Sequence, residues 1–177
     1  NAVIHLTAIA GRLNIPLYPD IFNAMGEKVP CITDVQPAGK NLVDAFDKAG
    51  GVPAVMQRLG NLIDTDVITY TGKKLKILLN KIKQRDDRVI RKLTDPVTQA
   101  PTISILFGNI APRGAVIKTA AASPHLLQHS GPAFVFDSYE DMLKSIDDEN
   151  LPVDASTVLV LRHAGPKAVP GMPEWGM

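Results

Sequence analysis

Residues 102–118 read TISILFGNIAPRGAVIK, in which two β-rich pieces are separated by turns that contain glycine and proline. Further short β-rich pieces follow at residues 133–136 and 156–161, and one helix, capped by Ser138, is predicted between them. Short strands at this spacing, bounded by turn residues, are typical of a barrel or a sandwich. We therefore expect a mainly β, barrel-like domain to begin in this half of the chain.

The first half of the chain has the apolar spacing of helices. Apolar residues three and four positions apart predict an amphipathic helix within residues 2–13. The other predicted elements are short, and they comprise helices at residues 20–25, 41–49, 53–59 and 73–83 and strands at residues 29–33 and 67–71. The expected fold class is α/β, with residues 1–92 as the C-terminal part of an α/β domain and residues 93–177 as the first part of the β-barrel domain.

Composition excludes several classes of function. Apolar residues make up 45% of the 177 residues, and the mean hydropathy is +0.05, which argues against disorder. No apolar run reaches the length of about 18 residues that a membrane span needs. The 19 basic and 18 acidic residues leave a net charge of +1, which argues against a nucleic-acid-binding surface. The single cysteine, Cys31, allows neither an internal disulfide nor a zinc finger or a complete iron–sulfur site.

Few side chains form a recognisable catalytic pattern. His125 and His129 are four residues apart and could form a metal pair on a helix, but they lack the intervening Glu of zinc proteases, so we interpret them as structural or surface residues. His5 is interpreted as a core histidine and Cys31 as a small buried hydrophobic residue. Gly50 and Gly51 are interpreted as a turn, with anion binding at the following helix as the alternative.

Two loops are rich in glycine and proline, at residues 108–119 and 164–174. Glycine permits a close approach of the backbone to a ligand, and proline stiffens a loop. A carboxylate on such a loop after a strand is well placed to bind a hard cation such as magnesium. The alternative is that both are ordinary connections. The chain starts at Asn1 without a signal peptide, and both ends look cut, so we expect an internal segment of a longer protein.

Five motifs follow one another along the chain, and they read NAVIHL (1–6), DVQPAGK (34–40), AGGVPAV (49–55), GNIAPRGAVIKT (108–119) and GPKAVPGMPE (165–174). They resemble the NAVLHL, DLxPSGK, AGGxPAV, GNLAPxGAVxKT and GPKGGPGMPE motifs of the dihydroxy-acid and sugar-acid dehydratases, a family of iron–sulfur hydro-lyases. Ala38 replaces the usual Ser, and Ala168 and Val169 replace glycines. Residues 122–129 and 173–176 resemble the aldonic-acid branch, of the arabinonate or xylonate type.

The resemblance implies removal of water from a 2,3-dihydroxy sugar acid to give a 2-keto-3-deoxy acid. It implies an iron–sulfur cluster acting on the departing hydroxyl, Mg²⁺ holding the carboxylate and the C2 oxygen, and a serine alkoxide that takes the C2 proton. Metal polarisation suits this step because it stabilises charge on both oxygens. The alternative within the family is the dihydroxy-acid dehydratase of branched-chain amino-acid biosynthesis. An alternative of another class is a non-catalytic binding or assembly module with the same fold.

Little of this machinery matches residues of this chain. The resemblance implies that the cluster ligands and the other magnesium ligands precede Asn1 and that the catalytic serine follows Met177. It matches Glu174 to a magnesium ligand, and Lys40, Lys118 and Thr119 are candidates for substrate binding. The expected partner is a small sugar acid or dihydroxy acid, with no nucleic acid and no membrane. We expect a homo-oligomer for the full-length form, in the cytoplasm, or in an organelle if the source is eukaryotic.

Overall fold

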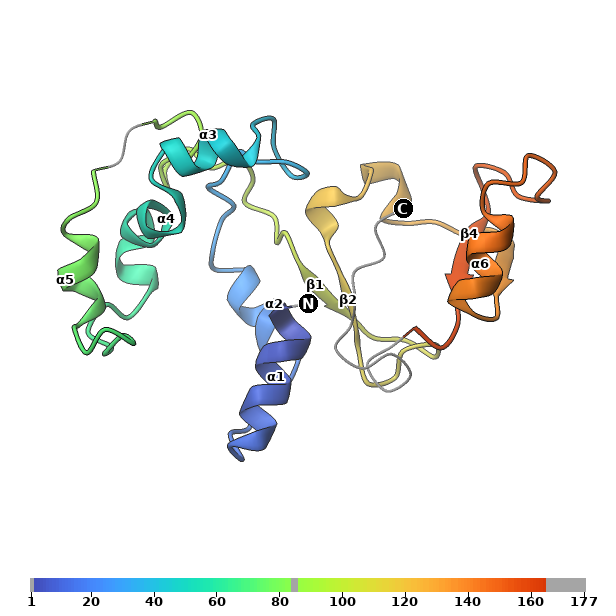
Figure 1. Cartoon of the computed structure of the whole chain (residues 1–177), viewed down its shortest axis with the longest axis horizontal. Helices are drawn as coiled ribbons and strands as arrows, with labels where there is room; N and C mark the ends of the chain where they lie inside the picture. Colours follow the sequence, from blue (N-terminus) through green and yellow to red (C-terminus); the bar gives the residue numbers. More distant parts are fainter. Residues whose placement is uncertain (1, 84–85, 165–177) are drawn as a thin grey trace. The chain divides into compact units, whose positions relative to one another are not determined.

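The computed structural model describes residues 2–83 and 86–164 (Figure 1). They fall into two compact units, one from Ala2 to Ala122 and one that begins at Ser123. Helices and short strands occur in both, which confirms the α/β class. The sheets of the described residues have two strands each, so they form no closed barrel.

The first unit begins with helices close to the positions that apolar spacing predicts. α1 (Ala2–Arg12) and α2 (Ile21–Gly26) are followed by α3 (Val43–Lys48) and α4 (Gly51–Leu59), and a 3-10 turn (Gly60–Leu62) ends this run. The chain passes from α3 to α4 at Gly50, whose φ of 106° lies in the left-handed region. A Cβ at this position would lie 2.7 Å from the Cβ of Ala54. Glycine therefore allows α4 to begin two residues earlier than predicted, directly after α3.

Two predictions between residues 67 and 83 are wrong in extent. The predicted strand at residues 67–71 is reduced to one antiparallel bridge, from Ile68 to Lys74, that closes a turn. In this turn the amide of Thr69 donates to the carbonyl of Lys73 at 2.9 Å, and Gly72 has a φ of 73°. This turn occupies the Lys73 carbonyl, so the following helix, α5 (Leu75–Leu79), starts later than predicted. It also ends early, and the side chain of Gln57 donates to the carbonyls of Leu79 and Ile82, at 3.1 Å each.

The core of the first unit lies where α3 and α4 meet two extended segments (Figure 1). Its buried members are Ile32, Ala49, Ala54, Val89 and Ile90. The predicted strand at residues 29–33 forms isolated bridges rather than a continuous ladder, from Cys31 to Thr98 and from Thr33 to Ile90. The ladder is interrupted because the partner segment turns at residues 92–95.

An antiparallel hairpin completes the first unit. β1 (Ser104–Leu106) pairs with β2 (Ala115–Ile117), with Ile105 opposite Val116. The other edge of β1 meets α2, where the side chain of Asn23 hydrogen-bonds to the backbone of Ile105. Gly114 has a φ of 98°, and a Cβ there would lie 3.1 Å from the side chain of Ile105. The glycine in this motif thus permits a close approach of the loop to the hairpin.

The second unit contains a strand–helix–strand crossover. β3 (Ala133–Phe136) and β4 (Val158–Leu161) are parallel and in register from Ala133–Val158 to Phe136–Leu161. α6 (Tyr139–Ser145) connects them, and the Ser138 hydroxyl accepts a hydrogen bond from the Asp141 amide at 3.1 Å, as the predicted cap requires. Phe136 and Met142 are buried between the strand and the helix.

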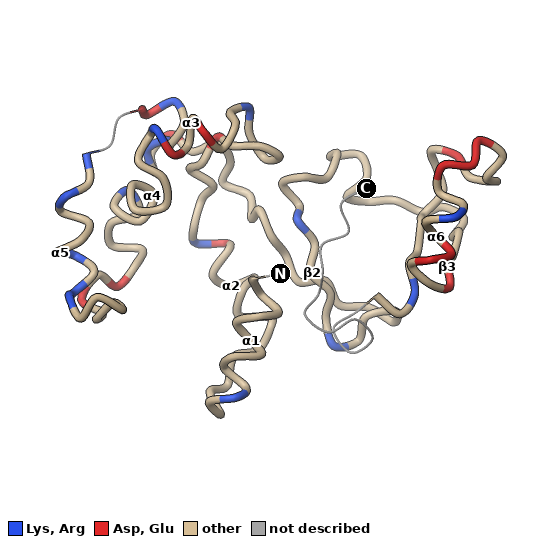
Figure 2. The backbone as a smooth tube through the Cα atoms, in the orientation of Figure 1, with Lys and Arg blue, Asp and Glu red and all other residues tan. Residues whose placement is uncertain are grey.

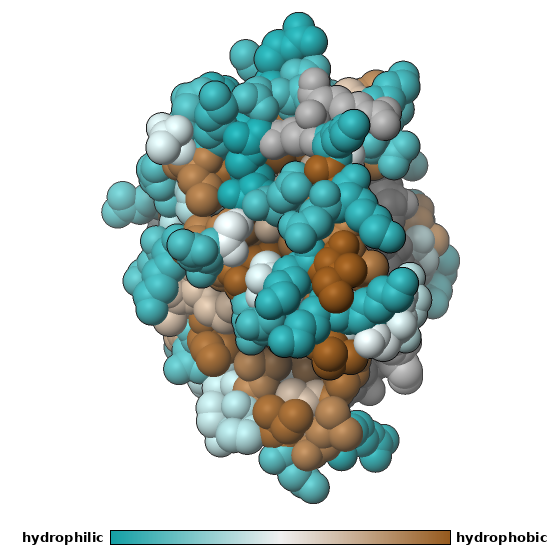
Figure 3. Space-filling model, turned by 90° about the vertical axis from the view of Figure 1, so that its left-hand side faces the viewer, coloured by the Kyte–Doolittle hydropathy of each residue, from teal (hydrophilic) through white to brown (hydrophobic). Residues whose placement is uncertain are grey.

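Charged and apolar side chains both reach the surface. Lys and Arg lie along α5 in the first unit, and acidic residues follow α6 in the second (Figure 2). Apolar patches interrupt the hydrophilic surface (Figure 3), and on α1 the exposed large apolar residues are Leu6 and Ile9. Among the helices of the described residues, none combines the length and the apolar character that crossing a bilayer requires.

Candidate functional site

A pocket of about 340 Å³ opens in the first unit beside the DVQPAGK loop. One wall comes from residues 31–38, with Val43 and Phe46 of α3, and the other comes from residues 102–103 and 118–120 at the base of the hairpin. Segments of two motifs that are far apart in the sequence therefore line one cavity. Apolar groups form most of its surface, and its polar members are Cys31, Thr33, Gln36, Thr102 and Lys118.

Hydrogen bonds within the DVQPAGK loop fix its shape. The backbone amide of Lys40 donates to Oδ1 of Asp34 at 2.7 Å, and the amide of Gly39 donates to the Val35 carbonyl at 2.9 Å. The Asn41 side chain closes the loop by donating to the Asp34 carbonyl at 2.7 Å. A Cβ at Gly39 would collide with Asp34, so only glycine fits there. The loop presents residues 36–38 to the pocket as a rigid wall.

The opposite wall is fixed at the base of the hairpin. The hydroxyl of Thr119 donates to the carbonyl of Pro101, and the amide of Ala120 donates to the carbonyl of Thr102 at 3.3 Å. Lys118 lines the pocket. In the sequence it lies between the last residue of β2, Ile117, and the two residues that make these contacts, Thr119 and Ala120. The position of its backbone is therefore set from both sides.

The structure distinguishes among the predicted site residues. Lys118 lines the pocket, whereas Lys40 is exposed and does not line it. The hydroxyl of Thr119 donates to the carbonyl of Pro101. Glu174 lies outside the described residues. Sequence reasoning missed Gln36 and Phe46 as pocket residues. Gln36 could have been found because it lies in the DVQPAGK motif, whereas no motif includes Phe46.

The histidine and cysteine predictions are corrected in part. The helical turn that starts at Pro124 ends at Leu126, and Nε2 of His129 lies 2.9 Å from the Ser156 carbonyl, so the two histidines share no helix face. His5 is exposed rather than in the core, because α1 buries Val3 and Ala10. Cys31 is only half-buried, in the wall of the pocket.

The described residues do not fit a metal or cluster site. No group of three or more His, Cys, Asp or Glu side chains in residues 2–83 and 86–164 is arranged to hold a metal ion. The sulfur of Cys31, the chain's single cysteine, lies 3.6 Å from the Thr33 carbonyl. One cysteine cannot supply the thiolates of a cluster, and the described carboxylates do not gather into a group of three.

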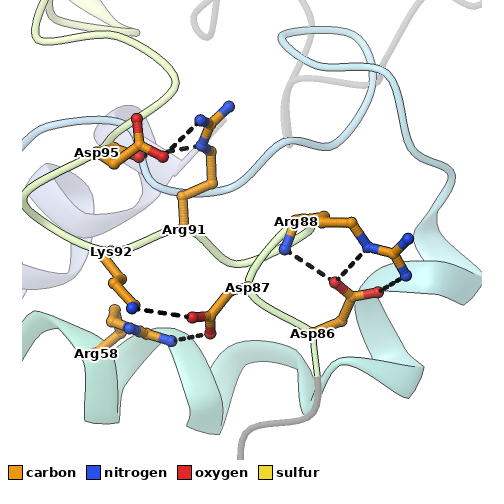
Figure 4. Close-up of polar contacts among 7 residues, drawn as sticks. All are labelled: Arg58, Asp86, Asp87, Arg88, Arg91, Lys92 and Asp95. Carbon is orange, nitrogen blue, oxygen red and sulfur yellow. Dashed lines mark hydrogen bonds and ion pairs between the residues drawn. The ribbon is translucent and has the colours of Figure 1, made fainter.

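A second hollow in the first unit is lined by charged residues that pair with one another (Figure 4). Asp87 contacts Arg58 at 2.6 Å and Lys92 at 3.6 Å. Hydrogen bonds from Arg88 lower the pKa of the Asp86 carboxyl, and the hydrogen bond to Asp95 raises the pKa of Arg91. This network of Arg58 and residues 86–95 is largely exposed, and its charges are already paired.

Two sequence models match the chain one after the other. The model of the dihydroxy-acid/6-phosphogluconate dehydratase N-terminal region matches residues 1–81, and that of the C-terminal region matches residues 88–177. The chain belongs to the dihydroxy-acid/6-phosphogluconate dehydratase family. The motifs on both walls of the pocket therefore come from the two regions of one family, the loop from the N-terminal region and Lys118 from the C-terminal region.

Relatives within this dehydratase family cover nearly the whole chain. L-arabonate dehydratase of Azospirillum brasilense is 45% identical, and 6-deoxy-6-sulfo-D-gluconate dehydratase of Pseudomonas putida is 44% identical, each over 99% of this chain. A dihydroxy-acid dehydratase of Acetivibrio thermocellus is 41% identical over 98% of the chain. The chain spans only 31% of the length of each of these relatives.

Proposed function

We propose that the complete protein is a hydro-lyase that dehydrates a 2,3-dihydroxy sugar acid. In this reaction the C2–H and C3–O bonds break, water leaves, and the resulting enol becomes a 2-keto-3-deoxy acid. Family membership supports the dehydratase activity, and the arabonate and sulfogluconate dehydratases among the relatives support a sugar acid as the substrate.

The observation that carries the proposal for this chain is the pocket between the DVQPAGK loop with α3 and the base of the hairpin, at residues 102–103, 118 and 120. It joins the DVQPAGK and GAVIKT motifs, and it has hydrogen-bonding groups for hydroxyls and one cation for an acid. A concave site with a few polar groups on apolar walls is the usual form of a small-molecule site. The part played by this chain is to bind and orient the acid, through Lys118 in the pocket and with Lys40 and Thr119 as further candidates.

The proposed cofactors are an iron–sulfur cluster and Mg²⁺, as the family resemblance implies. Together they would supply Lewis-acid chemistry at the two reacting oxygens. We assign the cluster ligands to the rest of the protein, outside this chain. We assign the magnesium ligands to the rest of the protein and to Glu174. The matches to residues 1–81 and 88–177 support the proposed domain boundary near residue 92. A homo-oligomer in the cytoplasm, or in an organelle of a eukaryote, remains part of the proposal.

One observation favours the branched-chain dihydroxy acid as a second candidate substrate. Apolar side chains form most of the pocket, among them Val43 and Phe46, and a dihydroxy-acid dehydratase is 41% identical to the chain. Apolar walls suit an alkyl group better than a chain of hydroxyls. The two substrates are therefore compared directly in the experiment.

The test is a substrate panel for the complete protein, purified without oxygen. Release of 2-keto acid is measured with L-arabinonate, D-xylonate, D-gluconate and 2,3-dihydroxy-3-methylbutanoate. Preference for an aldonic acid is the expected result, and preference for the branched acid would replace it with the second candidate. Failure to convert any of them, with cluster and Mg²⁺ bound, would favour the non-catalytic module.

A further inference from the structure

We propose that Lys118 binds the carboxylate of the substrate in the pocket beside the DVQPAGK loop. The proposal rests on the function proposed above and assigns one contact within it. It makes Lys118 a residue that touches the substrate, and it gives Lys40 and Thr119 no contact with the carboxylate.

The charges of the pocket lead to this assignment. Among the described residues that line the pocket, Lys118 is the single cationic group, and none of them is Asp or Glu. In the part of the chain that the structure describes, no carboxylate pairs with Lys118, whereas Lys74 and Lys76 both pair with Asp66. The ammonium group of Lys118 is therefore available to an anion from outside.

The position of Lys118 is held while its side chain stays available. Its neighbour Ile117 pairs with Ser104 in the hairpin, and its other neighbour, Thr119, is tied to Pro101. The lysine itself is exposed at the pocket wall. A fixed backbone reduces the entropy that is lost when the ammonium group binds a ligand.

The described residues of the wall opposite Lys118 carry no competing negative charge. Asp34 belongs to the DVQPAGK loop, but its carboxylate accepts the Lys40 amide and it lines the other, charged hollow. The loop instead presents Gln36, Pro37 and Ala38 to the pocket. An acid that enters the pocket thus meets an amide and apolar groups on one side and a cation on the other.

The carboxylate is the anionic group that every 2,3-dihydroxy acid carries, so it is the group that we assign to Lys118. A carboxylate has two oxygens and several lone pairs, so a bond to Lys118 leaves positions for other ligands. Thr33, Gln36 and Thr102 provide hydrogen-bonding groups in the same pocket for the hydroxyls of the acid.

The test uses the complete protein and three variants. Because a hydrogen bond to a charged group is lost, Lys118→Met should raise KM for the acid by about 10- to 100-fold with a much smaller change in kcat. Lys118→Arg keeps the charge and should recover most of the affinity. Lys81→Met is the matched control, since Lys81 is exposed and lies in neither wall of the pocket; its KM should stay within about twofold.

A second readout separates binding of the carboxylate from a structural role. The neutral amide of the same sugar acid is compared with the acid as a ligand by calorimetry. The wild type should prefer the acid, and this preference should fall about tenfold in Lys118→Met but not in Lys81→Met. The assignment of Lys118 would be overturned if the wild type binds the acid and Lys118→Met changes neither the preference for the acid over its amide nor the KM. A wild type that converts no acid overturns the proposed function instead.

Discussion

The side chain of Asn23 forms two hydrogen bonds with the backbone of Ile105, which lies 82 residues further along the chain. Its Nδ2 donates to the Ile105 carbonyl at 2.9 Å, and its Oδ1 accepts from the Ile105 amide at 2.7 Å. One amide side chain thus satisfies both polar groups on the outer edge of β1, as a neighbouring strand would. This contact ties α2 to the hairpin that carries Lys118.

Removing this contact should destabilise the hairpin. Asn23→Ala leaves both backbone groups of Ile105 without a partner. We therefore expect the free energy of unfolding of the hairpin to fall by about 1–3 kcal/mol. Hydrogen exchange of the Ile105 amide in the complete protein measures the loss, which should appear as faster exchange. Asn23→Asp keeps the acceptor and should retain part of the protection. Asn61→Ala, on an exposed turn, should leave this amide unchanged.

The carboxylate of Asp34 should control the loop beside the pocket. Asp34→Ala removes the acceptor for the Lys40 amide, so exchange of that amide should accelerate, and KM should rise because the wall at residues 36–38 loosens. Asp34→Asn keeps an oxygen acceptor, so its exchange rate at the Lys40 amide and its KM should lie between those of the wild type and of Asp34→Ala. Equal exchange at Lys40 in all three proteins would contradict this role.

The turn between α3 and α4 should tolerate only glycine at position 50. Gly50→Ala introduces a Cβ 2.7 Å from that of Ala54 and places alanine at a φ of 106°. We expect the free energy of unfolding to fall by about 1–3 kcal/mol, which should appear as a lower unfolding temperature of the complete protein. Ala54→Gly removes the opposing methyl group. Gly50→Ala combined with Ala54→Gly should therefore be less destabilised than the sum of the single variants, and simple additivity would contradict the clash.

The turn before β4 should weaken in acid. Hydrogen bonds from Ser156 and Thr157 lower the pKa of Asp154 below its usual value of 3.8. The folded form thus favours the charged carboxylate, so its contribution to stability is present above the unfolded pKa and is lost as pH falls through the lower, folded pKa. Titration of Asp154 by NMR should show that Ser156→Ala moves its pKa upward. Ser123→Ala, which lies outside this turn, should not.

Local patterns were sufficient to predict the elements that rely on neighbours in sequence. The apolar spacing in residues 2–13 predicted α1, and Ser138 with Asp141 predicted the start of α6. The turn at residues 69–73 could not be predicted from β-branched residues, because it depends on how Gly72 and the Lys73 carbonyl are used. Likewise, the interrupted pairing of residues 31–33 depends on the turn in their distant partner segment.

For the site, the motifs predicted the right segments but not the role of each residue. Lys40, Lys118 and Thr119 are equivalent candidates in the sequence, and only the hydrogen bond from Thr119 to Pro101 and the lining of the pocket separate them. Val43 and Phe46 could not be assigned to the pocket from sequence, since helical spacing alone would place them against a core. Their place depends on how α3 meets the DVQPAGK loop.

The hairpin from Pro101 to Thr119 is closed at its own base, by the contact from Thr119 to Pro101 and by three registered pairs between β1 and β2. We therefore expect that it can be exchanged as a unit between dehydratases, provided that the recipient has an asparagine at the position of Asn23. Chimeras built at these two junctions would transfer Thr102, Ile103 and Lys118 of the pocket wall together, which makes the hairpin a practical unit for redesigning which acids a dehydratase of this family accepts.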